Sequence, residues 1–156
     1  MTLRGVRDDD LEVLYENQAD PESAAMAGVD ARDREGFLAH QARVDADPEA
    51  VQRVILLDGG EVAGDIGSWR SESGFREIGY RIGAQFWGRG IATAAVTSFL
   101  SELDERPLYA HALKTNTASI RVLEKSGFVQ VPEGGEVGDD PLAYEFVLHR
   151  VPQSRR

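Results

Sequence analysis

The chain has 156 residues, of which 42% are hydrophobic and 28% charged, a composition typical of one globular domain rather than of a disordered or fibrous protein. The absence of cysteine excludes disulfides and thiolate chemistry, and the three histidines, His40, His111 and His149, are too far apart in sequence to suggest a metal site. Seventeen basic against 27 acidic residues give a net charge of -10, which disfavours binding to nucleic acid or anionic membranes and suits a cationic partner such as an amine.

The first third of the chain predicts a short opening segment and two helices. Residues 3–7 form the opening and lead into a helix that Pro21 ends. A second helix begins near Asp33 and stops at Asp47, because a residue that precedes proline avoids the helical region. The stretch between the helices, residues 22–31, is rich in small residues and is expected to be flexible.

From residue 51 the hydrophobic pattern changes to the period of strands, interrupted by two further helices. The expected strands are 51–57, 61–69, 75–82, 107–113, 128–131 and 141–149. One helix covers residues 91–103, and Asn116 caps another that runs to Lys125 and ends at Gly127. This order of elements predicts an α/β fold with a mixed sheet that has helices on both faces.

No internal repeat or domain linker interrupts the sequence, so a single domain is expected over residues 1–150, with a short tail at 151–156. Residues 132–140 are expected to form a polar, acidic loop. No apolar run approaches the roughly 20 residues that span a bilayer, and the N-terminus has no apolar stretch typical of a signal peptide. A cytoplasmic protein is therefore expected.

The segment from Gln85 to Ala92 lies between a strand and an alanine-rich helix and contains Gly88 and Gly90. Glycines allow successive backbone amides to point into one concavity, and the start of a helix adds a partial positive charge. A phosphate or pyrophosphate fits such a site. The lysine and hydroxyl of a P-loop are missing and the spacing differs from the dinucleotide fingerprint, so a plain turn is the alternative.

Three segments in this order resemble the GNAT acetyltransferases: Ile78-Gly79-Tyr80-Arg81-Ile82, Gln85-Phe86-Trp87-Gly88-Arg89-Gly90, and residues 116–128. The second fits the family's Q/R-x-x-G-x-G/A loop, and the third fits its Asn-x-x-Ser helix that ends in Glu-Lys-x-Gly-Phe. The match is closest to the subgroup that includes the ribosomal-protein N-terminal alanine acetyltransferases. It runs through residues 3–148.

This resemblance implies a V-shaped, mostly antiparallel sheet of about seven strands, whose central strands splay apart and admit acetyl-CoA. It implies that the backbone amides of residues 88–92 bind the pyrophosphate and that the strand 78–82 pairs with the pantetheine amides. The implied cofactor-binding residues are Ile78, Tyr80, Ile82, Gln85, Gly88, Arg89, Gly90, Ile91, Ala92 and Asn116.

Ser119 is the first of two catalytic candidates. Many GNAT enzymes have a tyrosine on the last helix that protonates the departing CoA thiolate, but the matching residue here is Leu123. Ser119 matches the serine of the subgroup and is the replacement candidate. Its alternative role is a hydrogen bond to the backbone of its own helix.

Glu77 is the second catalytic candidate, as a general base that takes a proton from the acceptor amine through one or more waters. Strand alternation places it on the face opposite Ile78 and Tyr80. The alternative is a strand carboxylate paired with Arg76 or Arg81. Glu72, on the adjoining turn, is the reserve candidate.

Other residues have no motif to support a role. Trp69 either lines an acceptor pocket or packs at the rim of the core. His111, for which the sequence shows no partner, is expected to be structural, and Tyr144 and Glu145 lie in a region that helps to enclose the acceptor in similar proteins. Residues 22–34, together with the acidic loop 132–140, are expected to shape the acceptor site.

The resemblance implies transfer of an acetyl group from acetyl-CoA to a primary amine, without a covalent enzyme intermediate. Such chemistry suits a chain that lacks cysteine. The acceptor is left open among a protein or peptide N-terminus, an aminoglycoside-like molecule, a polyamine and an amino acid. The alternatives are a noncatalytic acyl-CoA-binding sensor, which Leu123 favours, and a partner-binding domain with a coincidental glycine loop. Homodimers are common in the resembled family.

Overall fold

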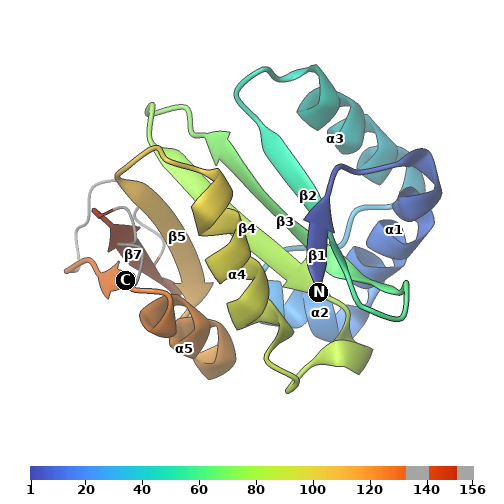
Figure 1. Ribbon diagram of the computed structural model, residues 1–156. Coiled ribbons are helices and arrows are strands. Elements are labelled where there is room, and N and C mark those ends of the chain that lie inside the picture. Colours follow the sequence, from blue (N-terminus) through green and yellow to red (C-terminus); the bar gives the residue numbers. More distant parts are fainter. Residues whose placement is uncertain (133–140, 151–156) are drawn as a thin grey trace.

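A seven-stranded sheet with helices on both faces forms the structure, a computed structural model that describes residues 1–132 and 141–150 (Figure 1). The strands are β1 (Thr2–Arg4), β2 (Val51–Leu56), β3 (Val62–Arg70), β4 (Arg76–Ile82), β5 (Leu108–Leu113), β6 (Val129–Gln130) and β7 (Ala143–Leu148). The helices are α1 (Leu11–Ala19), α2 (Pro21–Ala27), α3 (Arg34–Ala46), α4 (Ile91–Glu102) and α5 (Thr117–Lys125), with short 3-10 turns at Asp8–Asp10 and Ala84–Phe86.

The strand order is β1-β2-β3-β4-β5-β7-β6, and every neighbouring pair is antiparallel except β4 and β5. These two parallel strands share a single paired position, Glu77 opposite Tyr109. By contrast, β3 and β4 are paired from Gly64–Ile82 to Arg70–Arg76. Strands β4 and β5 therefore separate after Glu77, which confirms the expected mixed, mostly antiparallel sheet whose central strands splay apart.

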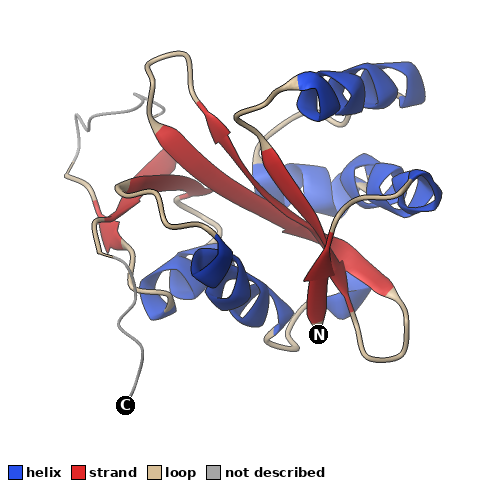
Figure 2. Ribbon diagram, turned by 45° about the horizontal axis from the view of Figure 1, so that its top comes forward, coloured by secondary structure: helices blue, strands red, loops and turns tan. Residues whose placement is uncertain are grey.

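The alternation of β4 directs its apolar side chains to one face of the sheet. Ile78 and Ile82 are buried in one cluster with Phe99 of α4 and Leu123 of α5. The opposite face of β2 to β4 is covered by α1 to α3, where Phe37 is buried. Figure 2 shows these two groups of helices on the two sides of the sheet. We refer to the two sides as the α4–α5 face and the α1–α3 face.

One expectation about local structure is wrong, because residues 22–31 are not an irregular stretch but contain most of α2. Pro21 is the first residue of this helix, a position where its fixed φ and missing N–H are favourable. The side chain of Asp20 accepts a hydrogen bond from the backbone N–H of Ser23 (3.0 Å), and Gly28 ends the helix with a φ of 71°. Proline thus both ends α1 and begins α2.

The predicted cap at Asn116 and the expected start of a helix near Asp33 are confirmed. Asp33 accepts a hydrogen bond from the backbone N–H of Gly36 (2.7 Å), and Asn116 accepts one from that of Ser119 (3.1 Å). Gly127 follows α5 with a φ of 96°. The remaining helices and strands agree with the sequence within about two residues at each end. The predicted tail and nearly all of the predicted acidic loop, residues 133–140, lie outside the described residues.

Candidate active site

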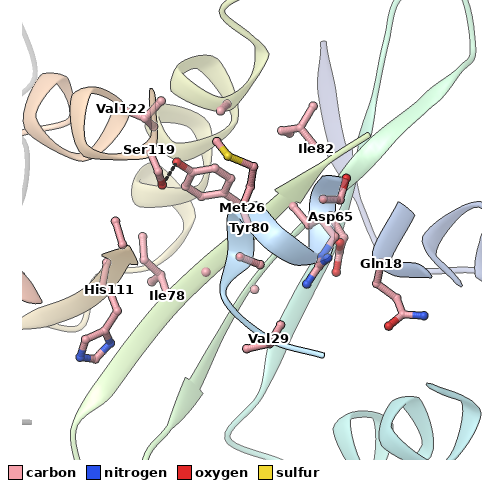
Figure 3. A pocket seen from close by; sticks show the side chains of 18 of the residues that line it. Gln18, Met26, Val29, Asp65, Ile78, Tyr80, Ile82, His111, Ser119 and Val122 are labelled. Atoms are coloured by element: carbon pink, nitrogen blue, oxygen red, sulfur yellow. Dashed lines mark hydrogen bonds between the residues drawn. The ribbon is translucent and has the colours of Figure 1, made fainter. Parts of the chain in front are cut away.

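A cavity of about 1040 Å³ lies where β4 and β5 separate. Residues 78–82 of β4 and 110–113 of β5 line it, together with side chains from β3, α1 to α3, α5 and the segment before α4. Figure 3 shows Tyr80 and His111 directed to opposite sides of these strands, so the cavity reaches both faces of the sheet. This volume is large enough for a cofactor-sized ligand.

The segment before α4 forms one end of the cavity. Gly88 and Gly90 have φ values of 77° and 74°, and a Cβ added to either would meet no atom within 4 Å. Glycine is therefore favoured at both positions by the backbone conformation, and not by a lack of space for a side chain. No side chain caps α4, and its first intrahelical bond runs from the N–H of Ala94 to the carbonyl of Gly90 (3.2 Å). The amides of residues 91–93 precede this bond and can bind an anion.

Two aromatic contacts fix this segment. The indole Nε1 of Trp87 donates a hydrogen bond to the carbonyl of Ile82 (2.9 Å), which ties the loop to the end of β4. The guanidinium carbon of Arg89 lies 5.7 Å from the centre of the Phe86 ring. Arg89 therefore adds a positive charge beside the uncapped helix start.

On the α4–α5 face, the hydroxyl of Tyr80 lies 2.7 Å from the hydroxyl of Ser119 (Figure 3). Ser119 thus uses its side chain to contact β4. Leu123, which stands where many GNAT enzymes have tyrosine, is 1% exposed. Burial raises the pKa of Tyr80, and the bond to Ser119 offsets only part of this shift. The Tyr80 phenol is therefore protonated at neutral pH and able to donate a hydrogen bond.

Asn116 connects the start of α5 to α2. Besides capping α5, it donates a hydrogen bond from Nδ2 to the carbonyl of Met26 (3.2 Å). Both atoms of its amide therefore have protein partners. Asn116 lines the cavity, and its contact with Met26 places α2 against one wall of the site.

On the α1–α3 face, the side chains of Glu77 and His111 lie in close contact. Oε1 of Glu77 lies 3.1 Å from Nδ1 of His111, and Oε2 of Glu145 lies 4.0 Å from Nε2. The side chains of Glu77 and Glu145 are 13% and 8% exposed, whereas that of His111 is 34% exposed. The structure therefore supplies a partner for His111 that the sequence alone did not identify. No ion pair joins Glu77 to Arg76 or Arg81 in the part of the chain that the structure describes.

Trp69 lies next to this pair, in the position opposite Glu77 on β3. It is 41% exposed, and a Cβ on Gly79 would lie 2.8 Å from its Cη2 atom. The indole therefore covers β4 at a residue that has no side chain. Gly67 is paired with Gly79 on the same face, so the floor of the cavity here is backbone.

Asp65 and Arg81 face each other further along the same strands. Oδ2 of Asp65 accepts a hydrogen bond from Gln52 (3.1 Å). Burial raises the pKa of the Asp65 carboxyl, although Gln52 and Arg81 act in the opposite sense. Burial also lowers the pKa of Arg81, and its buried Nη1 has no hydrogen-bond partner among the described residues. This half-buried pair gives the cavity a polar wall that the sequence analysis missed.

Most of the predicted site residues line the cavity, but three do not. Gln85 is exposed and Glu72 lies in the exposed β3–β4 turn. Glu77 is also absent from the described residues that line the cavity, whereas its partner His111 is present. Residues 22–34 contribute Met26 and other side chains to the lining.

Metal sites and membrane-spanning helices can be assessed for residues 1–132 and 141–150, which the structure describes. Within them, no group of three or more His, Cys, Asp or Glu side chains is arranged to hold a metal ion. None of their helices combines the length and apolar character needed to cross a bilayer.

Residues 1–129 match the acetyltransferase (GNAT) domain family, and the chain belongs to this family. No match was found among curated proteins.

Several solved structures share the fold. A spermidine N-acetyltransferase from Vibrio cholerae, in complex with CoA and spermine, is 15% identical over 95% of this chain and 94% of that chain, with a TM-score of 0.79. An acetyltransferase from Thermus thermophilus is 22% identical over 96% of both chains, with a TM-score of 0.77. An aminoglycoside acetyltransferase in complex with coenzyme A is 21% identical over 96% of this chain and 94% of that chain, also at 0.77.

Proposed function

We propose that this protein is an acetyl-CoA-dependent N-acetyltransferase that transfers an acetyl group to a primary amine by direct attack. The observation that carries the proposal is the separation of β4 and β5 beside a cavity that ends at the uncapped start of α4. Membership of the GNAT family supports the same reading. Two of the similar structures contain CoA, and their names include spermidine and aminoglycoside acetyltransferases.

The residues at the start of α4 fit a pyrophosphate. The amides of residues 88–92 would hold it, because the two glycines leave the approach to the backbone free of side chains. Arg89 would add charge near the phosphates. The edge of β4 at residues 78–82 would bind the pantetheine arm through its backbone, since Ile78 and Ile82 bury their side chains in the core. When bound, acetyl-CoA supplies an acetyl group activated as a thioester.

Ser119 is proposed to assist the departing thiolate, directly or through water. Its hydroxyl lies in the cavity, and its hydrogen bond to Tyr80 fixes its position. A hydroxyl held beside the leaving group can donate a hydrogen bond as negative charge develops on sulfur. Asn116, three residues earlier, is proposed to lie near the pantetheine arm.

We propose that Glu77 helps to remove a proton from the acceptor amine. The amine arrives mostly as ammonium near neutral pH and needs a free lone pair to attack the thioester. Glu77 lies on the α1–α3 face, with Trp69 beside it. An aromatic ring next to a carboxylate favours a cationic group.

Three acceptor classes follow from the comparisons and from the resemblance. The similar structures suggest a polyamine or an aminoglycoside. The match of residues 116–128 to the subgroup of ribosomal-protein N-terminal alanine acetyltransferases suggests a protein or peptide N-terminus.

The function is tested by two measurements on the full chain. Calorimetry with acetyl-CoA measures binding, and the release of free thiol is then followed with spermine, an aminoglycoside and a peptide with N-terminal alanine. We expect binding, and thiol release with at least one of these amines. Binding without release to any amine would favour the noncatalytic sensor, and absence of binding would exclude both functions.

A further inference from the structure

The pairing of His111 with Glu77 bears directly on how the acceptor amine loses its proton. Of the two residues, only His111 is among the described residues that line the cavity. Its side chain is 34% exposed, whereas that of Glu77 is 13% exposed and lies 3.1 Å away. Glu77 therefore reaches the acceptor space through the imidazole ring.

The same contact favours one tautomer of the ring. An ionised carboxylate only accepts hydrogen bonds, so the short distance between Nδ1 of His111 and Oε1 of Glu77 favours a hydrogen on Nδ1. In the neutral ring, Nε2 is then the nitrogen with the lone pair. Oε2 of Glu145 is 4.0 Å from Nε2, which is beyond hydrogen-bond distance but close enough to stabilise a positive charge on the ring.

The position of His111 suits an acceptor that approaches the β4–β5 opening. It lies on β5 two residues after Tyr109, the partner of Glu77 in the only recorded β4–β5 pair of the described chain. The described titratable groups that face it from neighbouring strands are Glu77 on β4 and Glu145 on β7, with Tyr109 on its own strand.

We propose that His111 is the catalytic base of the reaction, and that Glu77 is a positioning residue that orients its ring. This inference rests on the proposed function. In it, the imidazole of His111 takes the proton from the amine, in place of a water molecule next to Glu77. The ammonium loses one proton to Nε2 of His111, and the resulting amine forms a bond to the thioester carbonyl carbon. The carbon–sulfur bond then breaks, the sulfur takes the second proton released by nitrogen, and His111 returns its proton to solvent. The products are the acetamide, CoA thiol and one proton.

The tautomer of His111 gives a test that needs no acceptor. Long-range ¹H–¹⁵N NMR spectra of the wild-type protein, recorded above the ordinary imidazole pKa of about 6.5, report which ring nitrogen carries the hydrogen. We expect Nδ1–H in the wild type and a shift toward Nε2–H in Glu77→Gln. A ring protonated at Nε2 in the wild type would overturn the proposal.

The second test follows thiol release with whichever amine of the panel the wild type acetylates. His111→Ala should lower kcat/KM by about 10²-fold near neutral pH, with a smaller deficit at high pH where the amine loses its proton unaided. Acetyl-CoA affinity should stay unchanged. His149→Ala, a histidine in an exposed position, is the matched control and should behave as the wild type.

Added imidazole should restore activity to His111→Ala, whereas pyrazole, a ring of the same shape and much weaker basicity, should not. Equal rescue by both would mean that His111 only fills space. A wild-type pH profile in His111→Ala, with thiol release intact, would overturn the base role and leave the proposed function standing. If the wild type binds acetyl-CoA but acetylates no amine, the proposed function fails and the base role of His111 fails with it.

Discussion

The hydroxyl oxygens of Tyr80 and Ser119 lie 2.7 Å apart, although 39 residues separate them in sequence. Tyr80 comes from β4 and Ser119 from α5, so the bond joins two walls of the cavity. Leu123 leaves α5 without the tyrosine that many GNAT enzymes have there. A phenol is present in the cavity on β4, and burial raises the pKa of Tyr80, so that this phenol is protonated at neutral pH.

This relationship predicts the effect of removing either hydroxyl. Ser119→Ala should lower kcat about tenfold with little change in acetyl-CoA affinity, because the lost interaction forms mainly in the transition state. Tyr80→Phe should have an effect of the same kind, and the double variant should be little worse than either single one. Steady-state kinetics and calorimetry give both quantities.

Ser101→Ala is the control, since Ser101 is an exposed serine on α4 that bonds to the carbonyl of Ser98. It should leave kcat unchanged. If kcat of Ser119→Ala stays within a factor of two of the wild type, the hydroxyl only contributes to helix packing and water protonates the thiolate.

A substitution at Gly90 tests whether the segment before α4 binds the pyrophosphate. Gly90→Val should weaken acetyl-CoA binding at least tenfold, about 1.4 kcal/mol, because its φ of 74° disfavours a β-branched residue and the amides would move. Gly74→Val is the matched control: Gly74 has a φ of 87°, also has no atom near its Cβ position, and lies in the β3–β4 turn. Equal affinity of the two folded variants would contradict the placement of the pyrophosphate.

The raised pKa of Asp65 predicts that the stability of the fold depends on pH. Its pKa is higher in the folded protein than the ordinary value of 3.8, so the folded state binds its proton more tightly than the unfolded state does. This group therefore lowers the free energy of unfolding as pH rises from 3.8 through the folded-state pKa. Asp65→Asn should raise the melting temperature at neutral pH but not below pH 3.8. Glu72→Gln, in an exposed turn, is the control, and a neutral-pH loss of stability in Asp65→Asn would refute the argument.

Gly64 tests the close approach of β3 to β4. A Cβ at this position would collide with the backbone carbonyl oxygen of Arg81, which cannot move without breaking the strand pairing. Gly64→Ala should lower the free energy of unfolding by about 3 kcal/mol. Gly5→Ala, where the Cβ would meet no atom within 4 Å, should be close to neutral. Denaturant unfolding of both variants makes the comparison.

The sequence predicts those parts of the fold that depend on neighbouring residues. Asp33, Asn116 and Gly127 mark helix ends by local hydrogen bonding and backbone conformation, and all three are confirmed. The helix that begins at Pro21 was missed, because proline ends one helix and starts another with the same geometry. The single β4–β5 pair at Glu77 could be expected only from the family resemblance, because strand pairing depends on contacts far apart in sequence.

The candidate site, too, could be predicted only where it depends on residues that are close in sequence. The motifs identify the loop at Gly88 and Gly90, and strand alternation places Glu77 on the face opposite Tyr80. The alternation could not reveal which strand lies beside Glu77, so the sequence analysis left His111 without a partner. The Tyr80–Ser119 bond was missed for a similar reason, since it joins a strand to a helix across the cavity.

The most direct test of the account is an experimental structure of the protein with acetyl-CoA. The account predicts the pantetheine arm between β4 and β5, with the pyrophosphate oxygens within hydrogen-bond distance of the amides of residues 88–92. The thioester should lie with Ser119 near its sulfur and His111 on the side from which the amine attacks. A cofactor bound outside the β4–β5 opening, or with its pyrophosphate away from the start of α4, would contradict the account.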